Sequence, residues 1–328
     1  MSPVLQTRNL EIGYRLKTGE KVLASGLNLE LGKGSFVALL GPNGSGKSTL
    51  IRTLSALLPA LKGEVLINGT EVHQMDKVRR AQSIALVLTD NINNPGLSVF
   101  DMVAYGRFPF TNWLGKLSNK DEQIIRESLE LVGMGAFAER QLLSLSDGEK
   151  QRVMIAKALA QQSDLMILDE PTAHLDLINR VEIMKLLRHL ALEQKRAILI
   201  STHELDLAMQ SADELWLMSG DKEIIRGMPE ELILSGSMQK VFARSAVDFD
   251  HLSGIFKIRH DITREIRFSS DNAQMALWTR KAFEKLGVAL SEEAKSDKKL
   301  EIRNGQWVYE ERVFDSLDAL VAMVKAGR

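Results

Sequence analysis

The stretch that decides the fold is Gly41-Pro-Asn-Gly-Ser-Gly-Lys-Ser48, which directly follows the apolar run Phe36-Val-Ala-Leu-Leu40. It matches the phosphate-loop pattern in the setting that the pattern requires, after a strand and before a helix. Glycines let the backbone turn its N–H groups inward as a nest for phosphate oxygens, and the helix N-terminus adds its positive dipole end. The stretch therefore predicts a nucleoside triphosphate site rather than a plain glycine-rich turn.

Two side chains of this loop have the chemistry that a triphosphate needs. Lys47 can reach the β- and γ-phosphates, and the Ser48 hydroxyl can ligate Mg²⁺. We expect the whole loop to line the bound nucleotide, with contacts from Gly41, Pro42, Asn43, Gly44, Ser45, Gly46, Lys47, Ser48 and Thr49.

The composition excludes several classes of protein. With 328 residues the chain is long enough for two domains, and its 42 Lys and Arg against 43 Asp and Glu argue against a nucleic-acid binder. The absence of cysteine rules out disulfides and Cys-ligated metal sites. Residues 1–8 lack the apolar core of a signal peptide, and no segment approaches the ~20 apolar residues of a spanning helix. We expect a soluble protein that reaches a membrane only through a partner.

Periodicity predicts strands on both sides of the phosphate loop. Residues 3–31 alternate between short β-like runs and polar turns, and Gly63-Glu-Val-Leu-Ile67 leads into Asn68-Gly69, the dipeptide of a type I′ hairpin. Two later runs, Leu165-Met-Ile-Leu168 and Ala197-Ile-Leu-Ile200, are apolar throughout. Such runs suit strands that are buried on both faces of a parallel sheet.

Residues 98–162 predict mostly helix, because Ser98 with Asp101 and Ser146 with Glu149 have capping-box spacing. The first two thirds of the chain therefore read as an α/β core with a helical insertion.

The pattern changes near residue 240. Two alternating runs, a helix-like stretch, a second hairpin around Asn304-Gly305 and a final amphipathic helix predict a small α+β domain of ββαββα order. Trp278 and Trp307 are expected in its core. We expect three divisions: an ATPase domain over residues 1–238, within it a helical subdomain over about 91–162, and an accessory or regulatory α+β domain over 239–328.

Adjacent carboxylates follow the run at 165–168. Asp169 can hold Mg²⁺, and Glu170 can orient and deprotonate the attacking water. A paired Asp-Glu is often only a polar loop start, but the phosphate loop upstream favours the catalytic role. His203 follows the next buried run, at the sheet edge where doubly wound folds bind ligands. It can donate to the γ-phosphate, whereas most lone histidines are structural.

The segment Leu145-Ser-Asp-Gly-Glu149 resembles the signature of ATP-binding cassette (ABC) ATPases, usually Leu-Ser-Gly-Gly-Gln, and it stands in that family's order. Ser146 and Glu149 can also simply cap a helix, and the two interpretations are compatible. A capped N-terminus with a free Ser146 hydroxyl and the Gly148 amide makes a γ-phosphate clamp. In the family this clamp acts on the opposing subunit's nucleotide, so the resemblance implies a homodimer with ATP between two copies.

Further matches extend the resemblance over about residues 3–225. Tyr14 matches the aromatic residue that stacks on adenine, although a strand-edge Tyr would look the same. Asp176 matches the acidic position of the loop that links the two active sites.

The chain departs from the family at two places. Asp147 and Glu149 replace Gly and Gln of the signature. Where the family places a Gln that helps to ligate Mg²⁺, this chain has Thr89 and Asp90. Thr89 is therefore a weaker third candidate for the metal site, beside Ser48 and Asp169.

The chain resembles a detached cassette, with one phosphate loop, no long coiled-coil insertion and no fused membrane helices. Residues 97–110 look like those of cassettes that serve iron–siderophore, haem and cobalamin permeases. Phe100, Phe108 and Trp113 are then candidates to line the groove for the permease, although Phe100 fits a helix core equally well.

The resemblance implies an ATP-hydrolysing, Mg²⁺-dependent importer subunit with a phosphate-loop NTPase fold of the ABC type, at the cytoplasmic face of the membrane. Its partners would be a second copy, a separate permease and an extracytoplasmic substrate-binding protein, with no nucleic acid. A soluble regulatory ATPase that switches a protein partner is the alternative, which the Thr89 departure keeps open. A nucleotide kinase would have no use for the signature.

Overall fold

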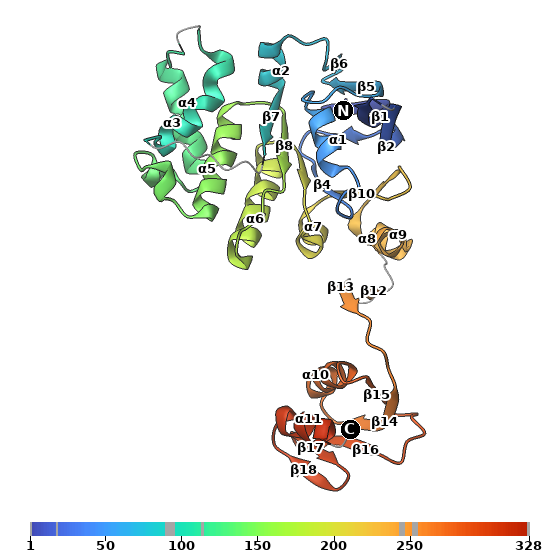
Figure 1. The fold of residues 1–328 in the computed structure, drawn as a ribbon. Coiled ribbons are helices and arrows are strands. Elements are labelled where there is room, and N and C mark those ends of the chain that lie inside the picture. The colour runs from blue at the N-terminus through green and yellow to red at the C-terminus, as the bar shows by residue number, and fades with distance from the viewer. Residues whose placement is uncertain are drawn as a thin grey trace. The chain divides into compact units, whose positions relative to one another are not determined.

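The computed structural model describes residues 2–17, 19–88, 96–112, 115–242, 247–250 and 255–326 (Figure 1). The chain divides into two compact units, of which the first comprises Met1–Ala243 with Phe249–Ile255 and the second Arg244–Asp248 with Phe256–Arg328. The expected domain boundary after residue 238 falls inside helix α9, Ser237–Phe242. The domain limits remain a prediction.

A six-stranded sheet forms the centre of the first unit, in the order β11-β10-β4-β9-β8-β7. Five strands run parallel, and only the edge strand β11 is antiparallel. Every residue of β4, β8 and β9 is buried, which confirms the strands expected from the apolar runs. The strands are β4 (Phe36–Leu40), β7 (Ile84–Val87), β8 (Leu165–Asp169), β9 (Ala197–Ser201), β10 (Glu214–Met218) and β11 (Ile224–Gly227).

Both faces of this sheet are covered. Alternate residues such as Val37 and Leu39 share one core with Leu50 and Ile51 of helix α1 (Lys47–Leu54) and with an antiparallel sheet. On the other face the strands contact α6 (Leu177–Glu193) and α7 (Leu205–Ser211). Coverage on both sides explains why these strands carry no polar alternation.

The antiparallel sheet of the first unit has the order β2-β1-β5-β6, with β3 paired to β1. Asn68 and Gly69 connect β5 to β6 with φ of 49° and 76°, the left-handed backbone of the expected type I′ turn. The strands are β1 (Leu5–Leu16), β2 (Gly19–Leu27), β3 (Glu30–Leu31), β5 (Lys62–Ile67) and β6 (Thr70–Glu71).

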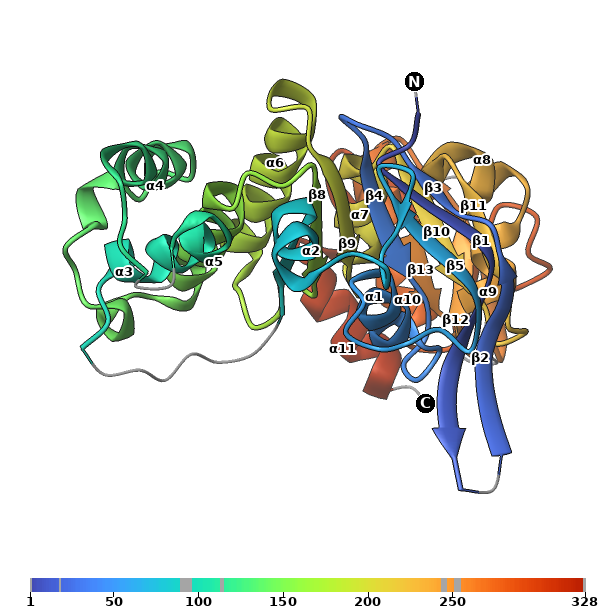
Figure 2. The same ribbon diagram turned by 90° about the horizontal axis from the view of Figure 1, so that it is seen from above.

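The expected helical segment is present and gathers beside the β7 end of the central sheet, away from β1 and β2 (Figures 1 and 2). Capping boxes begin α3 at Ser98 and α5 at Ser146, as expected, and a third, which the sequence analysis did not identify, begins α4 at Ser118. The segment contains α3 (Val99–Ala104), the 3₁₀ turn η1 (Tyr105–Phe110), α4 (Asn119–Leu131) and α5 (Asp147–Ala160). The first unit also contains α2 (Lys77–Ser83), α8 (Pro229–Leu234) and α9, in addition to α1, α6 and α7.

The second unit is a five-stranded mixed sheet, in the order β15-β14-β16-β17-β18, packed against two helices. The elements are β14 (Arg264–Ser270), α10 (Ala273–Glu284), β15 (Val288–Ser291), β16 (Lys299–Arg303), β17 (Gln306–Tyr309), β18 (Arg312–Phe314) and α11 (Leu317–Ala326). Before it, β12 (Val247–Asp250) pairs with β13 (Ile255–Ile258).

Three details of this unit differ from the expectation. Strands β15 and β18 were not expected, because four and three residues are too few to show a clear alternation. Trp278 is 55% exposed rather than buried in the core. Trp307 is half-buried, and its indole N–H donates to Thr279 Oγ1 at 2.8 Å.

Among the described residues, no helix combines the length and the apolar character that crossing a membrane requires.

A buried ion pair connects η1 to α4 within the helical segment. Nε of Arg107 donates to Asp121 Oδ1 at 2.8 Å, and the same guanidinium donates to the carbonyl oxygen of Ala160. Both side chains are almost completely buried. The hydroxyl of Ser118 and the guanidinium of Arg107 lower the pKa of Asp121 against the opposing effect of burial. This carboxylate therefore stabilises the fold above its unfolded-state pKa, and the contribution is lost as pH falls through the folded-state pKa.

We expect Asp121→Ala to lower the free energy of unfolding by about 3 to 5 kcal/mol, because the buried guanidinium loses its counter-charge. Denaturant titration measures the change. Glu122→Ala, at an exposed position in the same first helical turn, is the control and should cost less than about 1 kcal/mol. Equal effects of the two variants would show that the pair has no special role.

Candidate nucleotide-binding site

The carboxyl ends of three neighbouring parallel strands bring most of the predicted site residues together. Leu39 of β4 and Asp169 of β8 are both registered with Ser201 of β9. The phosphate loop after β4, Glu170 after β8 and His203 after β9 therefore lie at one edge of the sheet. This is the edge at which open α/β sheets bind ligands.

The phosphate loop has the backbone that its glycines predict. Gly46 caps helix α1 with φ of 109°, and Gly44 has φ of 79°, both in the region that favours glycine. At Gly41 the need for glycine comes instead from the neighbouring backbone, since a Cβ there would lie 2.6 Å from the carbonyl oxygen of Met218. The remaining loop residues, Pro42, Asn43, Ser45, Lys47, Ser48 and Thr49, follow this path into α1.

Lys47 folds back over the loop. Its ammonium donates to the carbonyl oxygens of Gly41 at 2.9 Å and Pro42 at 3.2 Å, and the residue is only 6% exposed. Burial lowers the pKa of Lys47, while the nearby carboxylates of Glu170 and Asp169 act in the opposite direction. A cation in contact with the loop backbone and near two carboxylates is placed for phosphate binding.

Ser45, like Lys47, indicates that the loop binds a ligand. Its Oγ is buried and has no hydrogen-bond partner in the described residues. Buried polar atoms are nearly always satisfied, so an orphan in a phosphate loop fits a group that the loop is built to receive.

Ser201 contacts the carboxylate of Asp169 and the backbone of Glu170, and sequence reasoning missed it. Its Oγ donates to Asp169 Oδ1 and accepts from the backbone N–H of Glu170 at 3.0 Å. Glu170 has φ of 50°, in the left-handed region, so the chain turns sharply directly after β8. A serine at the end of an otherwise apolar run, beside the acidic strand, was the available signal.

Glu170 and His203 are in direct contact. Nε2 of His203 lies 2.6 Å from Oε1 of Glu170, and both side chains are partly exposed. The predicted base and the predicted γ-phosphate contact are therefore neighbours, although 33 positions separate them in the sequence.

The candidate metal ligands fit an Mg²⁺ that arrives with a nucleotide. Ser48 is exposed and its hydroxyl has no partner among the described residues, while Asp169 is 8% exposed. Thr89 lies outside the described residues, as does Trp113. No group of three or more His, Cys, Asp or Glu in the described part of the chain could hold a metal alone. Mg²⁺ commonly uses one or two protein ligands with phosphate and water, which suits this donor set.

Tyr14 lies beside the loop. Its hydroxyl is 2.7 Å from Thr49 Oγ1 in α1, and the residue is 39% exposed. The contact holds an exposed aromatic ring next to the phosphate loop, where a base could stack on it.

The signature segment gives one correction. The Ser146 hydroxyl is not free, because it donates to Glu149 Oε2 at 2.8 Å and accepts from the Glu149 N–H at 3.4 Å. Gly148 also has a packing role, since a Cβ there would lie 2.6 Å from Asn179 Oδ1. Among the described residues, no hydrogen bond or ion pair joins Ser146 or Gly148 to the phosphate loop.

The fold and this edge define a nucleotide-binding protein of the phosphate-loop class. The family model described as ABC transporter matches residues 24–173. An uncharacterised ABC transporter ATP-binding protein of Methanocaldococcus jannaschii is 37% identical over 258 residues, which are 79% of this chain and 88% of that protein. The iron(3+)-hydroxamate import ATP-binding protein FhuC of Bacillus subtilis is 38% identical over 73% of this chain and 87% of its own length.

Further similar proteins are also components of ABC transporters. A cobalamin import ATP-binding protein of Halobacterium salinarum is 35% identical over 67% of this chain and 55% of its own length. A metal-chelate type ABC transporter in an inward-facing conformation superposes with a TM-score of 0.64 and 28% identity, over 74% of this chain and 89% of that one. A dimeric bacterial ABC transporter cassette superposes with a TM-score of 0.60 and 25% identity, over 69% of this chain and 98% of that one. The chain belongs to the ATP-binding, ATP-hydrolysing proteins of ABC transporters.

We expect Ser201→Ala to raise the Mg²⁺ concentration for half-maximal ATPase activity by roughly 10- to 100-fold, because Asp169 loses the group that orients it. ATP binding without Mg²⁺ should change little, which separates a positioning role from general damage. Ser163→Ala is the matched control, since Ser163 is also a buried serine, but its hydroxyl donates to the carbonyl oxygen of Leu165 only two positions along the chain. An unchanged Mg²⁺ dependence would contradict this role for Ser201.

Proposed function

We propose that this chain is the ATP-hydrolysing subunit of an importer, acting as a homodimer beneath a separate permease. The observation that carries the catalytic part is the contact of Glu170 with His203 at the edge where Lys47 closes the phosphate loop. A carboxylate in contact with a histidine beside a phosphate site suits activation of water for attack on the γ-phosphate.

Each residue of the site has a separate role in this proposal. Lys47 and the loop N–H groups bind the phosphates, and Ser48 and Asp169 hold Mg²⁺, with Thr89 as a weaker candidate. Bound Mg²⁺ supplies positive charge to the β- and γ-phosphates. Glu170 orients the water and accepts its proton, while His203 donates to the γ-phosphate. Tyr14 stacks on adenine.

A second copy of the chain completes the site. Ser146 and Gly148 begin helix α5 and are proposed to contact the partner's γ-phosphate through the N-terminus of that helix. An exposed apolar pair supports a protein contact nearby in sequence, since Leu177 and Ile178 follow Asp176 and are 70% and 72% exposed. The dimeric cassette among the structural neighbours also supports this arrangement.

Exposed aromatic residues support docking to a permease. Tyr105, Phe108 and Phe110 of η1 are 37%, 54% and 40% exposed, and aromatic residues favour interfaces. Phe100 is half-buried, with the guanidinium of Arg126 over its ring, so it is the weaker candidate. We infer that the protein works at the cytoplasmic face of the membrane, through a permease fed by an extracytoplasmic substrate-binding protein.

The names of the relatives support the substrate class. Iron–hydroxamate and cobalamin import proteins are among them, so we propose an iron–siderophore, haem or cobalamin-type cargo. Family membership favours this proposal over a soluble regulatory ATPase. Co-purification separates the two, because an importer subunit should bring down a polytopic membrane protein, and repeated recovery of soluble partners alone would favour the regulatory ATPase.

We expect Glu170→Gln to nearly abolish ATP hydrolysis while ATP binding remains, because the amide cannot accept the proton of the attacking water. Size-exclusion chromatography with ATP should show a trapped dimer. Glu193→Gln, at an exposed helix end, is the control and should behave like the wild type. Hydrolysis by Glu170→Gln at the wild-type rate would show that Glu170 is not the base.

Uptake measurements identify the cargo. Vesicles that contain the chain with its permease and substrate-binding protein should accumulate one of three substrates when ATP is inside: a ferric siderophore, haem or cobalamin. Vesicles with Glu170→Gln give the background. Failure with all three substrates would overturn the proposed class, while ATP hydrolysis would still stand.

A further inference from the structure

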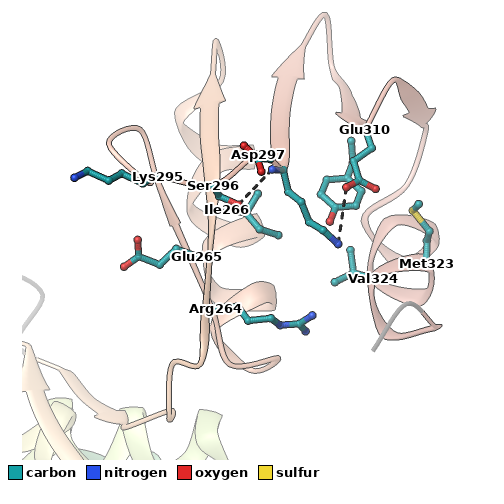
Figure 3. A pocket seen from close by; sticks show the side chains of 11 residues that line it. Arg264, Glu265, Ile266, Lys295, Ser296, Asp297, Glu310, Met323 and Val324 are labelled. Carbon is teal, nitrogen blue, oxygen red and sulfur yellow. Dashed lines mark hydrogen bonds and ion pairs between the residues drawn. The ribbon is translucent and has the colours of Figure 1, made fainter.

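A cavity of about 520 Å³ lies within the second unit, apart from every residue assigned to nucleotide (Figure 3). Its walls come from the start of β14, the loop at 295–298 before β16, the end of β17 and helix α11. The volume lies in the range of small-molecule binding sites.

Arg264 supplies a positive charge without a counter-ion. Its guanidinium makes no hydrogen bond or ion pair with any residue that the structure describes. Figure 3 shows it extending from β14 toward α11, whereas Glu265 and Lys295 extend away from that side. A planar guanidinium fork matches the geometry of a carboxylate or phosphate.

The opposite charges on the far wall already neutralise each other. Nζ of Lys298 lies 3.8 Å from Oε1 of Glu310, so neither charge is fully free for a ligand. Tyr309, which also lines the cavity, is 3% exposed. Burial raises the pKa of the Tyr309 phenol. The lining also includes the carboxylate of Asp297, so the cavity as a whole has no excess of positive charge, and an anion would be bound by Arg264 in particular.

An apolar surface completes the cavity. Ile266 of β14 and Val324 of α11 are 4% and 7% exposed and belong to the core of this unit, and Met323 lies beside them. A ligand that fills the cavity must place apolar atoms against this surface, because these side chains offer it no hydrogen bonds.

We propose that this cavity binds a small organic anion, whose carboxylate or phosphate group pairs with Arg264 and whose apolar body lies against Ile266 and Val324. The site is independent of ATP hydrolysis, since none of its residues belongs to the nucleotide site. It makes the second unit a ligand-binding module.

Calorimetric titration of the full-length protein tests the proposal with three probes. Benzoate and phenyl phosphate have the same apolar ring and differ in the anionic group, and inorganic phosphate has no apolar body. Saturating ADP is present throughout. It occupies the phosphate loop, so that binding of a probe there does not contribute to the measured heat. We expect saturable binding of benzoate or phenyl phosphate, which identifies the anionic group, and at least about tenfold weaker binding of inorganic phosphate.

Variants of Arg264 locate the binding. Arg264→Gln should weaken binding of the preferred probe by at least about tenfold, because a charge-assisted hydrogen bond is lost, and Arg264→Lys should retain part of it. Arg303→Gln, at an exposed arginine on β16 outside the cavity, should bind like the wild type. Thermal unfolding of each variant establishes that this unit is still folded.

Two results would overturn the proposal. One is the absence of saturable binding by both ring-containing probes. The other is binding to a folded Arg264→Gln variant that is as tight as to the wild type. Neither result bears on Lys47 or Glu170, so the proposed ATPase mechanism would be unaffected.

Discussion

The parallel alignment of β4, β9 and β8 is the constraint on which the first unit depends. These strands end at the same level, with Ser201 registered against both neighbours, and each chain segment that leaves them carries a group of the site. A shift of one strand by a single residue would reverse its side chains and separate Asp169 from Ser201. The burial of all three strands on both faces prevents such a shift, because every position is packed. Packing of the sheet thus determines the position of the candidate catalytic groups.

Much of this could be predicted from local signals. The phosphate loop, the type I′ turn at Asn68-Gly69 and the capping boxes at Ser98 and Ser146 depend on a few neighbouring residues, and all are present. The close contact of Glu170 with His203 could be expected only as a shared sheet edge, since its distance depends on the turn that each residue makes after its strand. Ser201 was missed because its role depends on the neighbouring strand β8 and not on its own sequence context.

The second unit was harder to predict because its elements are short and its sheet is mixed. Strands β15 and β18 owe their existence to pairing with β14 and β17 rather than to a pattern of their own. The cavity could not be foreseen, since it combines three residues of β14 with parts of a loop, β17 and α11. For Trp278 the sequence predicted a core position that the structure does not have. Tryptophan is usually buried, but this one lies on the exposed side of α10, with the Lys281 ammonium over its ring.

The start of helix α5 carries two negatively charged carboxylates, which is unusual for a surface that is proposed to contact a nucleotide. Asp147 is exposed and only loosely paired with Lys150 at 3.7 Å, and the Glu149 carboxylate accepts from both the N–H and the hydroxyl of Ser146. Two carboxylates there interact favourably with the positive end of the helix dipole and so offset the positive potential that a phosphate would meet. If two copies close over ATP as proposed, phosphate and carboxylate charges approach one another at this point. Added salt would screen that repulsion, so closure of the dimer should strengthen with ionic strength, the reverse of what an attractive charge pair would produce.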